Sequence, residues 1–180
     1  GYKVAVIDAD PQKSLSYWLS ERKKYYGEDD IGINFYNFDI RNLAEEVKKI
    51  KRKYDFIIID SPPAITFETL QIIKASNGVF VPVQPSPLDL MATLPFLQIA
   101  REERKKPLII LNRVMPRAKL TDAMILRLRY SGAKIARSRI SSKVIFAESF
   151  AVGRGVIDIN VTSDAAKEII NVGNEILRNL

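Results

Sequence analysis

The 180 residues include no cysteine and no histidine. These absences exclude disulfides, thiol nucleophiles, zinc sites built from cysteine or histidine, and catalysis by imidazole. A metal ion bound by these residues must therefore be a hard cation held by oxygen atoms. The sequence also lacks any apolar run near the ~20 residues needed to cross a bilayer, and no signal-peptide pattern precedes the first strand-like segment. We therefore expect a cytoplasmic protein with no membrane role.

The positive charge is unevenly distributed along the chain. The formal net charge is +7, yet thirteen Lys and Arg residues stand against three Asp and Glu residues between Arg101 and Lys143. The rest of the chain is therefore slightly acidic. Such a basic block favours a polyanionic partner, nucleic acid first among them. The alternative is that these residues form the solvated faces of ordinary helices, and composition alone does not separate the two interpretations.

Short β-branched apolar runs alternate with helical patterns along the chain. The runs typical of strands buried on both faces are Val4–Ile7, Phe56–Ile59, Val79–Val83 and Leu108–Leu111. Helical patterns begin near Pro11 and also cover about Arg41–Lys53, Phe67–Ala75, Leu90–Arg104, Thr121–Tyr130 and Thr162–Leu180. This alternation predicts an α/β fold with a mostly parallel, twisted sheet and helices on both faces. The length suits one domain over residues 1–180.

The last helical pattern has two possible roles. Thr162, Ser163 and Asp164 are candidate N-caps for it, and apolar residues follow at helical spacing. A membrane-surface helix would need a basic polar face and aromatic anchors, and the polar face here includes Glu168 and Glu175. We therefore expect this helix to pack on the core.

Acidic residues follow two of the predicted strands. Asp8 and Asp10 come directly after Val4–Ile7, and Asp60 comes directly after Phe56–Ile59. Ligands of open parallel sheets bind beyond the carboxyl ends of the strands, where neighbouring carboxylates can hold a hydrated Mg²⁺ or orient water. Asp10 followed by Pro11 is also typical of a helix start, with Asp10 as the N-cap. Both interpretations of Asp10 can hold together.

Two classes of protein use carboxylates arranged in this way. A receiver domain binds Mg²⁺ around a phosphorylated aspartate, but it also needs a lysine after its last strand, where this chain has Asn112-Arg113. The chain is also too long for a receiver. The second class is the deviant-Walker nucleotidases.

Several segments, in order, resemble the ParA family of partition ATPases, in particular the small plasmid-partition ParA proteins. Val4–Gln12 resembles the A′ motif, and Phe56–Pro63 resembles the Walker B strand with its turn. Further similarity lies in Val81–Leu90, in Leu111–Val114 and in Ser163–Ile169, the start of the terminal helix. The resemblance covers nearly the whole chain.

The resemblance implies a role for each matching residue. Asp10 would orient the water that attacks the γ-phosphate of ATP, and Asp8 would support the Mg²⁺ shell. Asp60 would accept a hydrogen bond from a Mg²⁺-bound water. Asn112 and the turn from Pro85 to Leu88 would flank the adenine. Asn112 is equally typical of a strand-end cap.

The glycine-rich phosphate-binding loop of this family is absent from the 180 residues, which contain no Gly-x-x-x-x-Gly-Lys-Ser/Thr. The resemblance implies that a strand, this loop and a helix would precede Gly1, with the strand between Phe56–Ile59 and Val79–Val83. Without the loop, the carboxylates would repel a triphosphate, so we expect residues 1–180 alone neither to bind nor to hydrolyse ATP. The gap in the sheet has three possible outcomes: the segment belongs to the protein but not to this sequence, a partner chain fills the gap, or the two strands pair directly.

The resemblance also implies a partner for the basic block. ParA-type proteins segregate DNA in an ATP-dependent cycle, in which a nucleotide-controlled homodimer binds nonspecific DNA on the nucleoid and a centromere-binding protein delivers the cargo. The basic residues in the corresponding half are Arg117, Lys119, Arg127, Arg129, Lys134, Arg137, Arg139 and Lys143. The alternative is a non-catalytic, truncated remnant or subunit that keeps the fold of the family.

Overall fold

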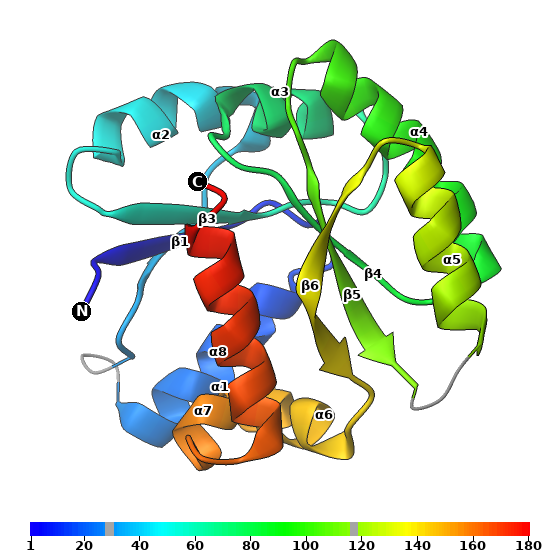
Figure 1. Ribbon diagram of the computed structural model, residues 1–180. Coiled ribbons are helices and arrows are strands. Elements are labelled where there is room, and N and C mark those ends of the chain that lie inside the picture. The colour runs from blue at the N-terminus through cyan, green and yellow to red at the C-terminus, as the bar shows by residue number, and fades with distance from the viewer. Residues whose placement is uncertain (28–30, 116–118) are drawn as a thin grey trace. The chain divides into compact units, whose positions relative to one another are not determined.

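The computed structural model describes residues 1–27, 31–115 and 119–180 (Figure 1). The chain forms two compact units. The first comprises residues 1–76 and 150–154, and the second comprises residues 77–149 and 155–180. No helix in the described ranges is long and apolar enough to cross a membrane. The single domain expected over residues 1–180 stays a prediction.

The first unit contains a three-stranded parallel sheet with β1 in its centre. The strand order is β2-β1-β3, with β1 at Val4–Asp8, β2 at Asn34–Tyr36 and β3 at Phe56–Asp60. Its helical segments are α1 (Ser14–Tyr26), the 3₁₀ turn η1 (Ile40–Asn42), α2 (Leu43–Ile50) and α3 (Phe67–Ala75). Figure 1 shows α2 and α3 on the same side of this sheet. Ile7 of β1, Leu43 of α2 and Ile72 of α3 form the buried core between them.

Residues 150–154 are bound to α1 by polar and aromatic contacts. The Trp18 indole Nε1–H donates to the Arg154 carbonyl at 3.3 Å, and Arg22 donates to the Gly153 carbonyl at 3.2 Å. The Arg154 guanidinium also lies 4.8 Å from the Tyr25 ring centroid, within cation–π range, and the ring centroids of Phe150 and Tyr17 are 6.4 Å apart. These contacts hold the segment against the backbone of the helix.

The second unit contains another parallel sheet, in the order β4-β5-β6, with β4 at Phe80–Val83, β5 at Leu108–Val114 and β6 at Lys134–Ser141. Its helices are α4 (Pro87–Glu102), α5 (Lys119–Tyr130), α7 (Val156–Ile159) and α8 (Asp164–Leu177). Helix α6 (Val144–Ala151) begins in this unit and ends in residues of the first.

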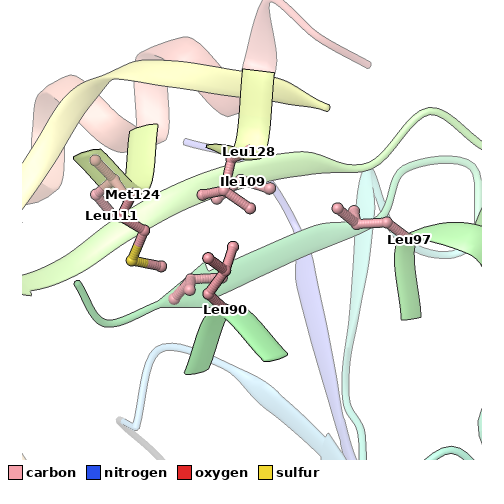
Figure 2. Close-up of a cluster of buried hydrophobic side chains, with 7 residues drawn as sticks. Leu90, Leu97, Ile109, Leu111, Met124 and Leu128 are labelled. Carbon is pink, nitrogen blue, oxygen red and sulfur yellow. The ribbon is translucent and has the colours of Figure 1, made fainter. Parts of the chain in front are cut away.

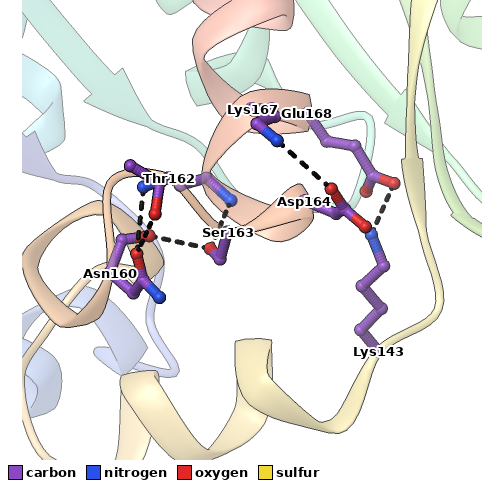
Figure 3. Close-up of polar contacts among 8 residues, drawn as sticks. Lys143, Asn160, Thr162, Ser163, Asp164, Lys167 and Glu168 are labelled. Atoms are coloured by element: carbon purple, nitrogen blue, oxygen red, sulfur yellow. Dashed lines mark hydrogen bonds and ion pairs between the residues drawn. The ribbon is translucent and has the colours of Figure 1, made fainter.

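Both faces of the second sheet are covered because the side chains of β5 alternate. Ile109 and Leu111 pack against α4 and α5 in one buried cluster (Figure 2). Leu108 and Ile110 face the other way and pack with Val172 of α8. The expected packing of the C-terminal helix on the core is thus confirmed, with Ser163 as its N-cap (Figure 3).

The edge strand β6 contains an irregularity that α8 compensates. Its residues Ile135 and Arg139 pair with Ile109 and Leu111, so extra residues of β6 lie between them. The Glu175 carboxylate accepts from the backbone N–H groups of Arg137 and Ser138, at 2.8 and 2.9 Å. Burial raises the pKa of Glu175, but these hydrogen bonds outweigh it and hold the pKa below its usual value.

Comparison with the sequence-based expectations confirms the parallel α/β fold and the four predicted strands, and it corrects two helix starts. Helix α1 begins at Ser14 rather than near Pro11, because Lys13 precedes it in a left-handed conformation with φ of 55°. Asp10 is therefore not the N-cap. Helix α4 begins at Pro87, capped by Ser86, three residues before its expected start. The strands β2 and β6 were not predicted.

The strands on either side of the expected gap end their sheets. Within the described ranges, β3 pairs only with β1 and β4 pairs only with β5. Direct pairing of these two strands, one of the three outcomes considered for the gap, is therefore wrong for this structure. The exposed fraction of Ile58 in β3 is 55%.

Candidate functional site

The acidic residues predicted from the strand ends meet in the first unit. Asp8 and Asp60 lie directly opposite each other in the register of β1 and β3. The Ala9 N–H donates to the Asp60 carbonyl at 2.9 Å, which extends the pairing by one residue. Asp10 follows in the turn between β1 and α1. The sequence thus predicted correctly that carboxylates from two strands come together at one end of the sheet.

Asp8 is fully buried and its carboxylate is held by the chain that follows it. Oδ2 accepts from the backbone N–H of Ser16 at 2.9 Å and also from the Ser16 hydroxyl. Oδ1 accepts from the Asp10 N–H at 3.2 Å. Asp8 therefore links the end of β1 to the first turn of α1 and fixes the path of the connection.

The turn from Asp10 to Lys13 replaces the expected helix start. Asp10 Oδ1 accepts from the Gln12 N–H at 2.8 Å, and the Asp10 carbonyl accepts from the Lys13 N–H at 3.0 Å. The Lys13 ammonium donates to the Asp8 carbonyl at 3.0 Å and to Asn37 Oδ1 at 3.4 Å. The carboxylate and carbonyl oxygens of Asp10 therefore accept N–H groups within this turn, instead of capping a helix that begins at Pro11.

Lys13 and Ser16 are residues of this site that sequence reasoning missed. Lys13 donates to the Asp8 carbonyl, and Ser16 donates to the Asp8 carboxylate. Their positions just after the acidic motif were the only available signal. The left-handed backbone conformation of Lys13 could not be predicted from the sequence, because glycine or asparagine is the usual residue in that conformation.

Asp60 lies in an unfavourable electrostatic environment for a carboxylate. Partial desolvation and the negative charges of Asp8 and Asp10 raise the pKa of Asp60 above its usual value. A cation between these groups would relieve the repulsion and lower that pKa. The raised pKa thus marks a place where positive charge is favoured.

The carboxylates do not form a complete metal site by themselves. In the part of the chain that the structure describes, no group of three acidic side chains is arranged to hold a metal ion. Two oxygen atoms of Asp8 are already used by N–H and O–H donors. Asp10 and Asp60 retain acceptor capacity for water, so this arrangement can orient water or support a hydrated cation.

The residues expected beside an adenine lie in the second unit. Asn112 lies within β5, and its Oδ1 accepts from the N–H of Arg113 at 2.9 Å, as a local cap would. Pro85 precedes α4, whereas Leu88 lies in its first turn and is 78% exposed. The second half of the expected turn from Pro85 to Leu88 therefore belongs to α4.

The predicted DNA-binding residues fall on two elements of the second unit. Arg117 lies outside the described residues, and Lys119 is the first residue of α5. The others lie on α5 (Arg127, Arg129), on β6 (Lys134, Arg137, Arg139) and just after β6 (Lys143). Lys143 forms an ion pair with Glu168 at 2.6 Å (Figure 3). Arg129, Arg137 and Arg139 line one pocket.

Known proteins are similar to this chain in sequence and in fold. A family model described as an AAA domain matches residues 28–110. The "Maintenance of carboxysome distribution protein A" of Halothiobacillus neapolitanus is 26% identical over 97% of this chain and 83% of its own length. The "ParA family protein MG470" of Mycoplasma genitalium is 24% identical over 84% of this chain, which spans 59% of that relative. The solved structure of the septum site-determining protein MinD with Mg-ADP from Pyrococcus horikoshii has a TM-score of 0.74 and 20% identity, covering 98% of this chain and 84% of that one.

The solved structure shares the parallel α/β fold of this chain. The chain is thus similar in sequence to ParA-type partition proteins and in fold to MinD.

Proposed function

We propose that this chain is the larger part of a ParA-type partition ATPase, which positions DNA cargo through a nucleotide-controlled dimer that binds nonspecific DNA. The observation that carries the proposal is the pairing of Asp8 with Asp60 at the ends of β1 and β3, with Asp10 in the adjoining turn. Desolvation, with repulsion from Asp8 and Asp10, raises the pKa of Asp60. A bound Mg²⁺ and its waters would offset this repulsion.

The residues fit a hydrated Mg²⁺ better than a directly ligated one. Asp60 is free to accept a hydrogen bond from a metal-bound water, and Asp8 is anchored by Ser16. Asp10 is the group placed to orient an attacking water. When bound, Mg²⁺ would neutralise the phosphate oxygens of ATP. The MinD relative was solved with Mg-ADP, which supports the same cofactor class here.

The glycine-rich loop that would bind the phosphates of ATP is not among these 180 residues. Within the described residues, the edge of β3 that does not pair with β1 can accept a strand, and Ile58 of β3 is 55% exposed. We propose that a strand followed by a glycine-rich loop fills this place. It would bring the N–H groups and lysine charge that balance the carboxylates.

Hydrolysis assays test the proposal directly. Purified residues 1–180 with Mg²⁺ and ATP should show no turnover, whereas a longer chain that carries the phosphate-binding loop should hydrolyse ATP. Asp10→Ala in that longer chain should lower the rate by about 100-fold or more, because the water loses its orienting group. Asp55→Ala is the matched control, since Asp55 lies just before the amino end of β3 and its carboxylate accepts from the Lys3 N–H.

Two results would contradict parts of this proposal. Mg²⁺-dependent hydrolysis by residues 1–180 alone, abolished by Asp10→Ala, would show that no external loop is needed. Full activity of the longer chain with Asp10→Ala would remove Asp10 from the mechanism.

Two alternatives to this proposal concern the cargo that is positioned and whether the protein is catalytic. The relative from Halothiobacillus neapolitanus is named for carboxysome distribution, which favours a protein compartment as a second candidate cargo. A non-catalytic subunit that keeps the fold is the other alternative. DNA-binding assays with and without ATP on the longer chain separate these cases, because only the partition cycle makes DNA binding depend on nucleotide. We further propose a cytoplasmic, nucleoid-associated protein with a centromere-binding partner.

A further inference from the structure

A pocket of about 210 Å³ lies between α5 and β6 in the second unit. Three arginines line it, Arg129 from α5 with Arg137 and Arg139 from β6. Its remaining lining is apolar and includes Leu111, Ile125 and Ile135. No acidic residue belongs to the described lining, so the pocket is a cationic rim over an apolar floor.

The two elements that hold the arginines are fixed by independent contacts. Helix α5 is anchored by Met124 and Leu128, which are buried against β5 and α4 (Figure 2). Strand β6 is fixed on its other side by Glu175 of α8, which binds the N–H groups of Arg137 and Ser138. Arg137 and Arg139 both line the pocket, on either side of Ser138. The three guanidinium groups thus have a stable frame.

The charge of this arrangement is balanced only in part. In residues 1–27, 31–115 and 119–180, none of the three guanidinium groups has an ion pair with a carboxylate. Glu175 interacts electrostatically with Arg137, but both of its oxygen atoms are bound to backbone N–H groups. Glu168 is bound to Ser141 and to Lys143.

Ordinary structural roles explain only part of the cluster. Arg129 lies in the last turn of α5, where a positive charge interacts favourably with the helix dipole. Arg137 and Arg139 lie on a strand and have no such role. Bringing three like charges to one pocket costs free energy, which a bound anion would offset.

We propose that this pocket is a binding site for a phosphate group. Guanidinium groups match phosphate oxygens in pairs of hydrogen bonds, and three of them suit a group with up to two negative charges. The apolar floor leaves room for part of the molecule that carries the phosphate. The phosphate has two possible sources, the phosphodiester backbone of DNA or a free phosphate ion. Only the first source rests on the proposed function.

Binding of inorganic phosphate tests the site. Calorimetric titration of the full chain with sodium phosphate, against sodium chloride at equal ionic strength, should show saturable binding to the wild type. Arg137→Gln with Arg139→Gln should weaken it by about tenfold or more, because two charge-assisted contacts are lost. Arg52→Gln is the matched control, an exposed arginine of the first unit that does not line the pocket, and should leave phosphate binding unchanged.

Absence of saturable phosphate binding by the wild type, or equal binding by the double variant, would overturn the proposal. Circular dichroism checks that the double variant folds. If it does not fold, Arg139→Lys keeps the charge but loses the paired hydrogen bonds, and its affinity for phosphate should still fall.

DNA binding at several salt concentrations identifies the source. If the phosphate belongs to DNA, the double variant should lower the slope of log K against log salt by about 0.9 for each lost contact, and phosphate should compete with DNA. If the source is free phosphate, DNA affinity should be the same in the double variant. A chain that binds phosphate but no DNA would contradict the proposed function and leave this site intact.

Discussion

Gly153 provides the sharpest test of how residues 150–154 are held in the first unit. Its φ is +65°, in the region that side chains with a Cβ rarely adopt. A Cβ at this position would lie 2.0 Å from the Arg22 backbone nitrogen and 2.4 Å from Arg22 Cα. These are backbone atoms of helix α1, so they cannot move aside as the end of a side chain can. We expect Gly153→Ala to be strongly destabilising.

The size of the effect follows from two costs and one smaller, opposing gain. An L-residue in the left-handed region costs about 1–2 kcal/mol. Forcing extra atoms into a close-packed contact costs about 1–3 kcal/mol more. The loss of unfolded-state entropy on replacing glycine returns about 0.4–1 kcal/mol. The free energy of unfolding should therefore fall by about 2–4 kcal/mol.

Gly32→Ala isolates the steric contribution. Gly32 lies in the same unit with φ of +71°, and no described atom lies within 4 Å of a Cβ placed there. This control includes the backbone cost but not the collision. The assay is urea unfolding followed by the fluorescence of Trp18, the only tryptophan, whose indole N–H binds the Arg154 carbonyl.

The midpoint for Gly153→Ala should be lower than that for Gly32→Ala by about 1 M urea, for a slope of about 1–3 kcal/mol/M. Equal midpoints for the two variants would refute the close contact between Gly153 and α1. An unchanged native emission of Trp18 together with equal midpoints would also contradict the position of residues 150–154.

Two further predictions concern carboxylates. Asp60→Asn should stabilise the cation-free protein at pH 7, because the raised pKa of Asp60 means that the folded state disfavours its charge. The stability of the wild type should fall as pH rises from below the usual aspartate pKa through the raised one. Thermal unfolding should therefore show that the stabilisation by Asp60→Asn, relative to the wild type, vanishes below about pH 4. Glu175→Gln should cost about 1–3 kcal/mol, because one backbone N–H of β6 loses its acceptor. The pKa of Glu175 is lowered in the folded state, so the stability that Glu175 provides should be present above the usual glutamate pKa and be lost as pH falls through the lowered value. An unchanged urea midpoint in the Glu175→Gln variant would contradict the contact with β6.

The sequence by itself determined the parallel α/β fold and the acidic strand ends. Runs such as Val4–Ile7 and Phe56–Ile59 are β-branched and apolar because their strands are buried, and this signal is local. The carboxylates follow these runs directly, so their meeting at one edge followed from parallel pairing alone. The order of motifs was enough to predict a resemblance to the ParA proteins.

Only the tertiary structure decided the features that depend on distant contacts. Strand β6 mixes charged, polar and apolar residues without strict alternation, and two of its N–H groups bind Glu175, 38 residues from Arg137. The turn at Lys13 formed because its hydrogen bonds to Asp8 and Asn37 outweigh the usual preference for a helix start at Asp10-Pro11. The arginine pocket joins α5 to β6, and Gly153 contacts α1 from more than a hundred residues away. Local propensity includes none of these contacts, because each depends on two segments that only the folded chain brings together.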